Sequence, residues 1–166
     1  MDNKLNRSLK KAEILPPSLR PWLKSKLIGY TVPFVGTAGV VFSKTTPEEW
    51  HASLQNKRKI RNHLKQVHAS AMVLVAEVTA VLLMASNLPD DRIPLVKKVE
   101  ADFVRRSSGG IKVKCLLTPE EREKILSEEK GELVIDVIIT DETDEQPVLA
   151  KITRAWVPKE KRNKTS

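Results

Sequence analysis

Residues 69–88, ASAMVLVAEVTAVLLMASNL, form the one long apolar segment of the chain. The segment has the length and composition of a helix and is apolar on every side, so protein rather than water must surround it. Its one charged residue is Glu77, and an ionised carboxylate there is costly unless it is paired or used. The segment is just long enough to span a bilayer, but Glu77 near its centre would cost roughly 2.5 to 3.5 kcal/mol on insertion scales. We therefore expect a buried helix, without stable membrane insertion.

The composition limits the classes of partner. A length of 166 residues fits one domain with a real core. The aromatic content of 4% argues against a stacking platform for nucleic acid, and neither a helix-turn-helix pattern nor a zinc spacing is present. The single Cys115 excludes an internal disulfide framework and a thiolate metal cluster. We expect no metal, no cofactor and no nucleic-acid partner, and nucleic-acid binding is the weakest rival class.

Positive charge is concentrated in the amino-terminal part of the chain. Residues 1–65 contain 13 lysine and arginine residues against 4 acidic ones, a net charge of +9, whereas the remainder is at −1. Such asymmetry points to an anionic partner, which could be nucleic acid, a membrane surface or the phosphates of a soluble cofactor. The first thirty residues have no continuous apolar core, so we expect a cytoplasmic protein. Because they are basic and nearly free of acidic residues, a mitochondrial location is the alternative.

Working outward from the long helix, the pattern predicts an α+β domain. Residues 1–18 read as a flexible amino-terminal arm, residues 19–158 as the folded domain and residues 159–166 as a basic carboxy-terminal tail. Ser18 is expected to cap a short helix that extends to Ile28. Apolar and alternating runs predict six strands of a sheet, at residues 38–43, 50–55, 95–105, 111–117, 132–140 and 148–157.

Thr118-Pro119-Glu120-Glu121 is a capping box with proline at the first helical position, which predicts a small charged helix to about Glu129 between two late strands. The connections are hairpin-like, so a doubly wound parallel sheet is excluded. A fully apolar helix needs a concave surface around it, and an antiparallel sheet of five to six strands can curl to provide one.

Three polar residues lie around the start of the long helix: Asn62, His68 and Glu77, at spacings of six and nine residues. Polar groups at a helix start combined with a buried carboxylate suggest an acyl-transfer site. In this spacing, and in Pro33-Phe34 before the first expected strand, the chain resembles the hotdog-fold acyl-CoA thioesterases. The resemblance is to the PaaI-like branch or its single-domain relatives, and it covers roughly residues 15–158.

The resemblance implies a hotdog fold, in which a curved antiparallel sheet wraps around one long central helix, and a homodimer, with a homotetramer as the alternative. It also implies catalytic roles for Asn62, His68, Glu77 and the Ala69 amide. Family members commonly have two glycines after the histidine, whereas this chain has Ala69-Ser70. Some members place a hydroxyl early in the strand after the helix, and residues 95–97 have none. Because of these two departures, the chain could have a changed substrate range or could have lost catalysis.

Helix geometry independently argues for a site between subunits. Nine residues correspond to about 13 Å of rise and half a turn, so His68 and Glu77 of one chain point to opposite sides. One thioester would then meet Asn62, His68 and Ala69 of one subunit and Glu77 of the other. We expect Glu77 to act as general base on water, with the Ala69 amide polarising the carbonyl. The alternatives are a structural Glu77 paired with a buried cation and a His68 that only caps the helix.

The substrate expected from this resemblance is an acyl-CoA, with coenzyme A as the carrier group. Its phosphates would be bound by Arg58 and Arg61 beside the site, and by Arg105 and Arg106 at a strand end. A fatty-acyl or acyl-CoA binding protein of the same fold, without catalysis, is the rival of a different class. A hotdog hydratase is a nearer enzyme rival, but its Asp and His within a short Asn-Pro loop are not found here.

Overall fold

Helix α4, Ala69–Asn87, is the central element of the computed structural model, which describes residues 1–160. Most of its side chains are buried, and Val75, Ala80 and Leu83 are fully inaccessible. The helix packs against five of the six strands and against α3, α5 and α1. It is the one helix among the described residues that is long and apolar enough to cross a membrane, and 61% of its apolar window is buried inside the protein. The predicted buried helix is confirmed.

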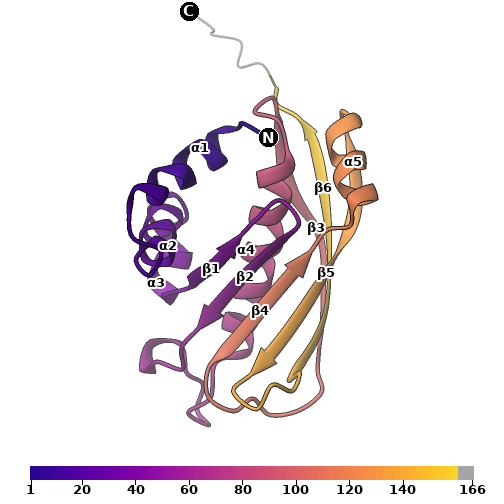
Figure 1. Cartoon of the computed structure of the whole chain (residues 1–166). Helices are drawn as coiled ribbons and strands as arrows, with labels where there is room; N and C mark the ends of the chain where they lie inside the picture. The colour runs from indigo at the N-terminus through magenta and orange to yellow at the C-terminus, as the bar shows by residue number, and fades with distance from the viewer. Residues whose placement is uncertain (161–166) are drawn as a thin grey trace, which may run out of the picture.

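A six-stranded antiparallel sheet curves around α4 (Figure 1). Its strand order is β1-β2-β4-β5-β6-β3, so β3 forms one edge of the sheet. The strands are β1 (Val41–Thr45), β2 (Glu49–Leu54), β3 (Arg92–Phe103), β4 (Ile111–Leu116), β5 (Gly131–Asp141) and β6 (Val148–Pro158). All six predicted strands are present, and their ends differ from the predicted ones by at most three residues.

Alternation along the strands separates the core face from the outer face. In β2, Trp50, Ala52 and Leu54 are buried and the residues between them are half-buried. In β6, Val148, Ile152, Arg154 and Trp156 are buried. Since side chains alternate along a strand, these residues face α4, and one of them is an arginine.

The first residues of the chain are helical, so the predicted flexible arm at residues 1–18 is wrong. Helix α1 spans Lys4–Lys10, and a short 3-10 helix, η1, follows at Lys11–Ile14. Leu9 and Ala12 are buried in this segment. The Asn3 side chain donates hydrogen bonds to the carbonyls of Ala85 (2.9 Å) and Leu88 (2.7 Å), at the end of α4. These distant contacts order a segment whose local sequence is mainly polar.

Along the chain, two further helices lie between this segment and the first strand. Helix α2 spans Arg20–Thr31, and Leu19 rather than the predicted Ser18 is its N-cap residue. Helix α3 spans Pro33–Ala38, where we expected Pro33-Phe34 to lead into a strand, and β1 begins only at Val41. Pro33 starts α3 because its fixed φ suits the first helical turn. The two helices touch closely: a Cβ atom added at Gly29 would lie 2.9 Å from the Gly36 Cα.

Helix α5, Pro119–Ser127, lies between β4 and β5 and begins with the predicted capping box. The Thr118 hydroxyl accepts from the Glu121 N–H, and the Glu121 carboxylate accepts from the Thr118 N–H. Most of the predicted basic tail at 159–166 lies outside the described residues.

Candidate functional site

The loop before α4 is closed by Asn62. Its Oδ1 atom accepts hydrogen bonds from the N–H groups of Leu64 (2.9 Å) and Gln66 (3.1 Å). An isolated β-bridge between Arg61 and Val67 closes the loop at its base. Asn62 therefore holds the loop that leads into α4, and its catalytic role stays a prediction.

His68 is the N-cap residue of α4. Its Nδ1 atom accepts a hydrogen bond from the Ser70 N–H (3.1 Å), and its carbonyl accepts from the N–H groups of Ala71 and Met72. The side chain is otherwise exposed. The capping role that the sequence left as an alternative is therefore present. No hydrogen bond of the ring Nε2 is found in residues 1–160, so this atom can face a ligand.

The Ala69 N–H is the unused donor at this helix start. Among the hydrogen bonds of residues 1–160 none comes from this group, whereas the Ser70 N–H is bonded to the His68 ring and the next two amides are bonded to the His68 carbonyl. An unpaired amide in the first turn of a 19-residue helix, at the positive end of its dipole, suits a developing oxyanion.

Glu77 forms an ion pair with Arg154. The Arg154 side chain extends from β6 and is 1% exposed, and its Nη2 atom lies 2.5 Å from Glu77 Oε1. The same nitrogen donates to the Glu77 backbone carbonyl. The Glu77 side chain keeps 29% of its surface exposed, so its carboxylate is held on one side and reaches solvent on the other. The sequence left open that Glu77 is a structural carboxylate paired with a buried cation, and Arg154 is such a cation.

Arg154 is the site residue that sequence reasoning missed. The signal was present: in the strand predicted at 148–157, position 154 shares a face with Ile152 and Trp156. An arginine at an inward position of a buried strand requires an acidic partner. Glu77, the single charge of the long helix, is that partner.

The pair lies near the open edge of the sheet. Arg154 on β6 is paired in register with Val96 on β3, the edge strand. One strand spacing, about 4.8 Å, therefore separates Arg154 from this edge. His68 and Ala69 lie at the start of the helix, about 13 Å along it from Glu77. The single chain thus does not bring the two halves of the predicted site together.

The four predicted phosphate-binding arginines differ in their contacts. Arg58, in the 3-10 helix η2 (Arg58–Ile60), and Arg106 are exposed. Arg61 donates to the Asn56 side chain and carbonyl, both at 2.8 Å. The guanidinium of Arg105 is engaged more fully, since it pairs with the buried Asp141 at 2.8 Å and contacts Glu145 and Thr143. Arg105 therefore braces the β5–β6 turn.

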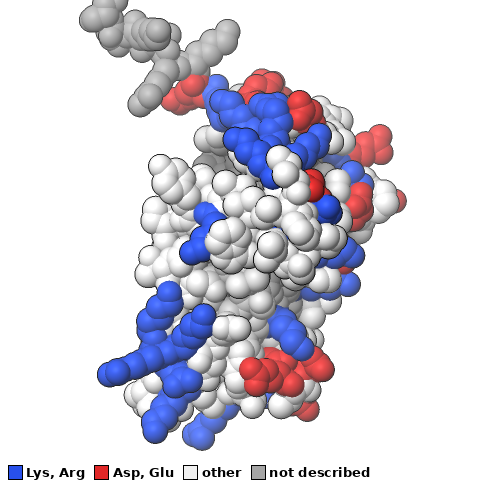
Figure 2. All heavy atoms as spheres, turned by 60° about the vertical axis from the view of Figure 1, so that its left-hand side comes forward, with Lys and Arg blue, Asp and Glu red and all other residues white. Residues whose placement is uncertain are grey.

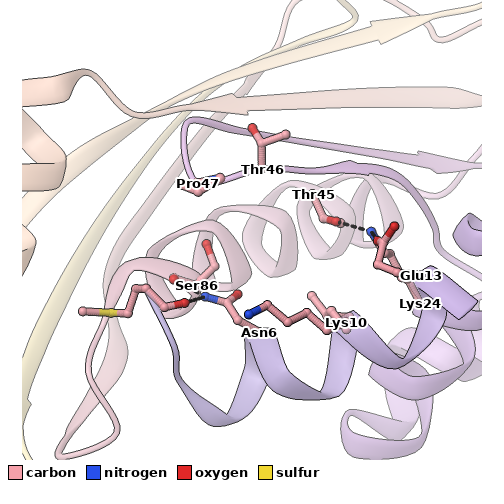
Figure 3. Close-up of a pocket in the computed structure, with 10 residues that line it drawn as sticks. Asn6, Lys10, Glu13, Lys24, Thr45, Thr46, Pro47 and Ser86 are labelled. Carbon is pink, nitrogen blue, oxygen red and sulfur yellow. Dashed lines mark hydrogen bonds and ion pairs between the residues drawn. The ribbon is translucent and has the colours of Figure 1, made fainter.

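Asn62, His68 and Glu77 line none of three cavities found in residues 1–160. One, of about 280 Å³, has a mixed polar and apolar lining and lies between α1, α2 and the β1–β2 turn (Figure 3). In it Lys24 donates to Thr45 and pairs with Glu13 at 2.9 Å. Another, of about 380 Å³, has a mainly apolar lining from α1, α2 and Leu82 of α4.

The buried thiol of Cys115 is no candidate nucleophile. Burial raises its pKa strongly, and the nearby Arg154 opposes this rise only in part.

Comparison with known proteins identifies the family. The sequence profile described as "Domain of unknown function (DUF4442)" matches residues 20–157, most of the chain. The chain belongs to the DUF4442 family. No curated protein sequence matches this DUF4442 protein.

Solved structures confirm the fold. A Pseudomonas aeruginosa protein of unknown function, named as a probable thioesterase, has a TM-score of 0.75 at 22% identity, covering 87% of this chain and 97% of that chain. A Haemophilus influenzae thioesterase has a TM-score of 0.65 at 13% identity, covering 84% and 94%. A mutant Pseudomonas aeruginosa thioesterase has a TM-score of 0.63 at 19% identity, covering 81% and 94%. The predicted hotdog fold is confirmed, whereas the PaaI-like branch stays a prediction.

Proposed function

We propose that this DUF4442 protein hydrolyses an acyl thioester at a site shared between two subunits. The observation that carries the proposal is the partly exposed Glu77 carboxylate, oriented by Arg154 one strand from an open sheet edge. The similarity in fold to proteins named thioesterases supports the reaction class. Neither argument depends on the other.

The reaction uses Glu77 as general base and the Ala69 amide as oxyanion donor. Glu77 takes a proton from water as the water oxygen bonds to the carbonyl carbon, and the carbonyl oxygen becomes an oxyanion at the Ala69 N–H. The C–S bond then breaks, and protonated Glu77 returns the proton to the thiolate. Asn62 and His68 hold the loop and the thioester in place, and Arg154 fixes the direction of the carboxylate.

The edge strand β3 is the surface on which a second subunit would pair. It is 12 residues long and has β6 as its only partner in the described part of the chain. β3 also carries charged residues, but a long edge strand with exposed apolar side chains is a surface that a second chain can cover. The apolar side chains on β3 and just after it that are 36–55% exposed are Leu95, Val96, Val99, Phe103 and Val104. Two-fold pairing along β3 would bring a second subunit next to Glu77.

Coenzyme A is the proposed carrier of the acyl group. Arg58 and Arg106 are exposed and available for its phosphates, and Arg61 keeps an exposed side chain although it is bonded to Asn56. Arg105 is the weakest of the four candidates because Asp141 already occupies its guanidinium.

Release of free thiol from a panel of acyl-CoA substrates tests the reaction, with Glu77→Gln as the matched variant that keeps the side-chain shape. We expect hydrolysis by the natural protein and loss of at least about a hundredfold in kcat for Glu77→Gln. Equal rates for the two proteins would remove Glu77 from the chemistry.

Mixed dimers test the shared site. Glu77→Gln and Asn62→Ala chains, each inactive alone, would be unfolded together and refolded in equal amounts. Half of the dimers would then be mixed, and one of their two sites would combine intact Asn62 and Glu77, giving about one quarter of the natural activity. A site within one chain predicts no recovery, because both chains of a mixed dimer carry a damaged site.

A non-catalytic acyl-binding protein is the second candidate, favoured by the Arg154 partner of Glu77 and by the apolar cavity of about 380 Å³. Retention of a labelled acyl-CoA without thiol release, unchanged in Glu77→Gln, would support binding over hydrolysis.

A further inference from the structure

A stretch without any charged residue runs from position 27 to position 43, between Lys26 and Lys44. It forms the end of α2, all of α3 and the start of β1. Part of the stretch is core, since Ile28, Val35 and Phe42 are buried. The rest forms an exposed apolar tip at the junction of the two helices.

This tip, residues 30–34 (YTVPF), is exposed at every position. Tyr30 is 91% exposed and Phe34 is 66% exposed, although aromatic side chains are normally at least half-covered. The close approach of Gly29 and Gly36 fixes α2 against α3 and holds the tip out from the body of the protein. Trp22, 58% exposed, lies two helical turns before Tyr30 on the same side of α2.

Basic residues lie one helical turn before the tip, at Lys26, and at the other end of the short helix α3. Lys57 and Lys59 are exposed and form no ion pair within residues 1–160. Lys59 reaches the end of α3, because its Nζ atom lies 3.7 Å from a Cβ built at Gly39. Lys26 is exposed on α2 between Trp22 and Tyr30. Figure 2, with the helical side turned forward, shows a broad uncharged surface with a cluster of basic side chains below it.

We propose that the tip and these lysines, Lys26, Lys57 and Lys59, dock the protein on the surface of an anionic lipid membrane. Exposed aromatic side chains insert favourably at the headgroup level, and adjacent lysines are attracted to anionic headgroups. The charge of this region suits an anionic membrane, because residues 1–65 carry a net charge of +9. The uncharged 17-residue stretch, residues 27–43, has no acidic side chain that would repel anionic headgroups. α4 stays buried, so the docking is peripheral. The proposal is independent of the thioesterase proposal.

Co-sedimentation with vesicles tests the docking. The full chain would be mixed with phosphatidylcholine vesicles and with vesicles in which about one third of the lipid is phosphatidylglycerol. We expect binding to the anionic vesicles that weakens as salt is added. Trp22 gives a second readout: Trp50 and Trp156 are 1% and 0% exposed, so a blue shift of the emission on binding would come from Trp22.

Two double variants separate the apolar and the charged contributions. Tyr30→Ser with Phe34→Ser should weaken vesicle binding on the order of tenfold, since apolar insertion is lost. Lys57→Gln with Lys59→Gln should weaken it about thirtyfold at low salt. The control, Val134→Ser with Leu149→Ser, removes two side chains that are each 48% exposed on the sheet and should leave binding unchanged. Thermal unfolding would check that each variant is folded.

Three results would overturn the proposal. The first is equal sedimentation with neutral and anionic vesicles, or with neither. The second is vesicle binding that the tip variant and the control variant reduce equally. The third is a fall in molecular mass by light scattering, without vesicles, for Tyr30→Ser with Phe34→Ser, which would make the tip an interface with a second copy of the chain.

Discussion

Removing Glu77 should destabilise the fold more than removing Arg154, although Glu77 is the more exposed partner of the pair. The reason is what each substitution leaves behind. Glu77→Ala leaves a guanidinium that is 1% exposed and retains only a backbone carbonyl as acceptor. Arg154→Met leaves a carboxylate that is 29% exposed and can be rehydrated. Stranding a buried charge costs about 3 kcal/mol, whereas a rehydrated carboxylate with some lost packing costs about 1 to 2 kcal/mol.

The double variant Glu77→Ala with Arg154→Met should be more stable than Glu77→Ala alone. The double variant removes the stranded charge. It also removes the Arg154 Nε atom, which is buried and has no hydrogen-bond partner within residues 1–160. We expect the double variant to lose about 2 kcal/mol, less than the sum of the single losses. Urea unfolding at one fixed protein concentration measures all four proteins, because an oligomer makes stability depend on concentration.

If the unfolding free energy lost by the double variant equalled the sum of the two single losses, the pairing would be refuted. An Arg154→Met variant that is less stable than Glu77→Ala would also refute it. Arg154→Lys is the matched control, since it keeps the charge but not the planar guanidinium, and it should fall between the natural protein and Arg154→Met. If Arg154 positions Glu77 for catalysis, Arg154→Met should also lower kcat with little change in KM. A purely structural pair would change neither parameter in the folded fraction.

Three further predictions concern the frame around the site. Burial alone would raise the pKa of Asp141, but hydrogen bonds from Thr143 and Ser108 and the Arg105 guanidinium lower it. The pKa of Asp141 in the folded state is thus below its unfolded value of about 4, so the ionised carboxylate contributes stability above pH 4 and this contribution is lost as the pH falls. Asp141→Asn should therefore cost about 2 kcal/mol of unfolding free energy at pH 7. Urea unfolding should show that the difference in stability between the variant and the natural protein shrinks in acid. Gly29→Ala should cost about 1 to 3 kcal/mol by forcing α2 from α3, measured by thermal unfolding. Thr118→Ala should cost about 1 kcal/mol by removing the α5 cap, measured by urea unfolding, and no change would contradict the capping box.

The sequence was sufficient for the parts of the fold that depend on local pattern. The apolar segment at 69–88 predicted α4, and alternation predicted six strands. The capping box predicted α5 to within two residues. The amino-terminal helices were missed or shortened because their order comes from contacts with distant residues. Asn3, for example, bonds to carbonyls at the end of α4, more than 80 positions along the chain.

The site shows the same division. The loop closed by Asn62 and the cap formed by His68 are local features, so the sequence around the helix start pointed to both residues, and their catalytic roles stay predictions. Local sequence did not identify the partner of Glu77, because Arg154 is 77 residues away and meets Glu77 only when β6 folds over α4. A lone acid in an apolar helix and a lone cation at an inward strand position could nevertheless be matched by elimination.

The way in which Glu77 is held bears on whether its carboxylate can act as a general base or is only structural. A structural ion pair gains most when both groups are fully satisfied and water is excluded. Here one oxygen, Oε1, bonds to Arg154, while the side chain remains 29% exposed and no hydrogen bond to Oε2 is found in residues 1–160. A general base needs this asymmetry, with one oxygen fixed for direction and the other able to accept a proton from water. The pairing that first suggested a structural role is therefore also what a catalytic Glu77 requires.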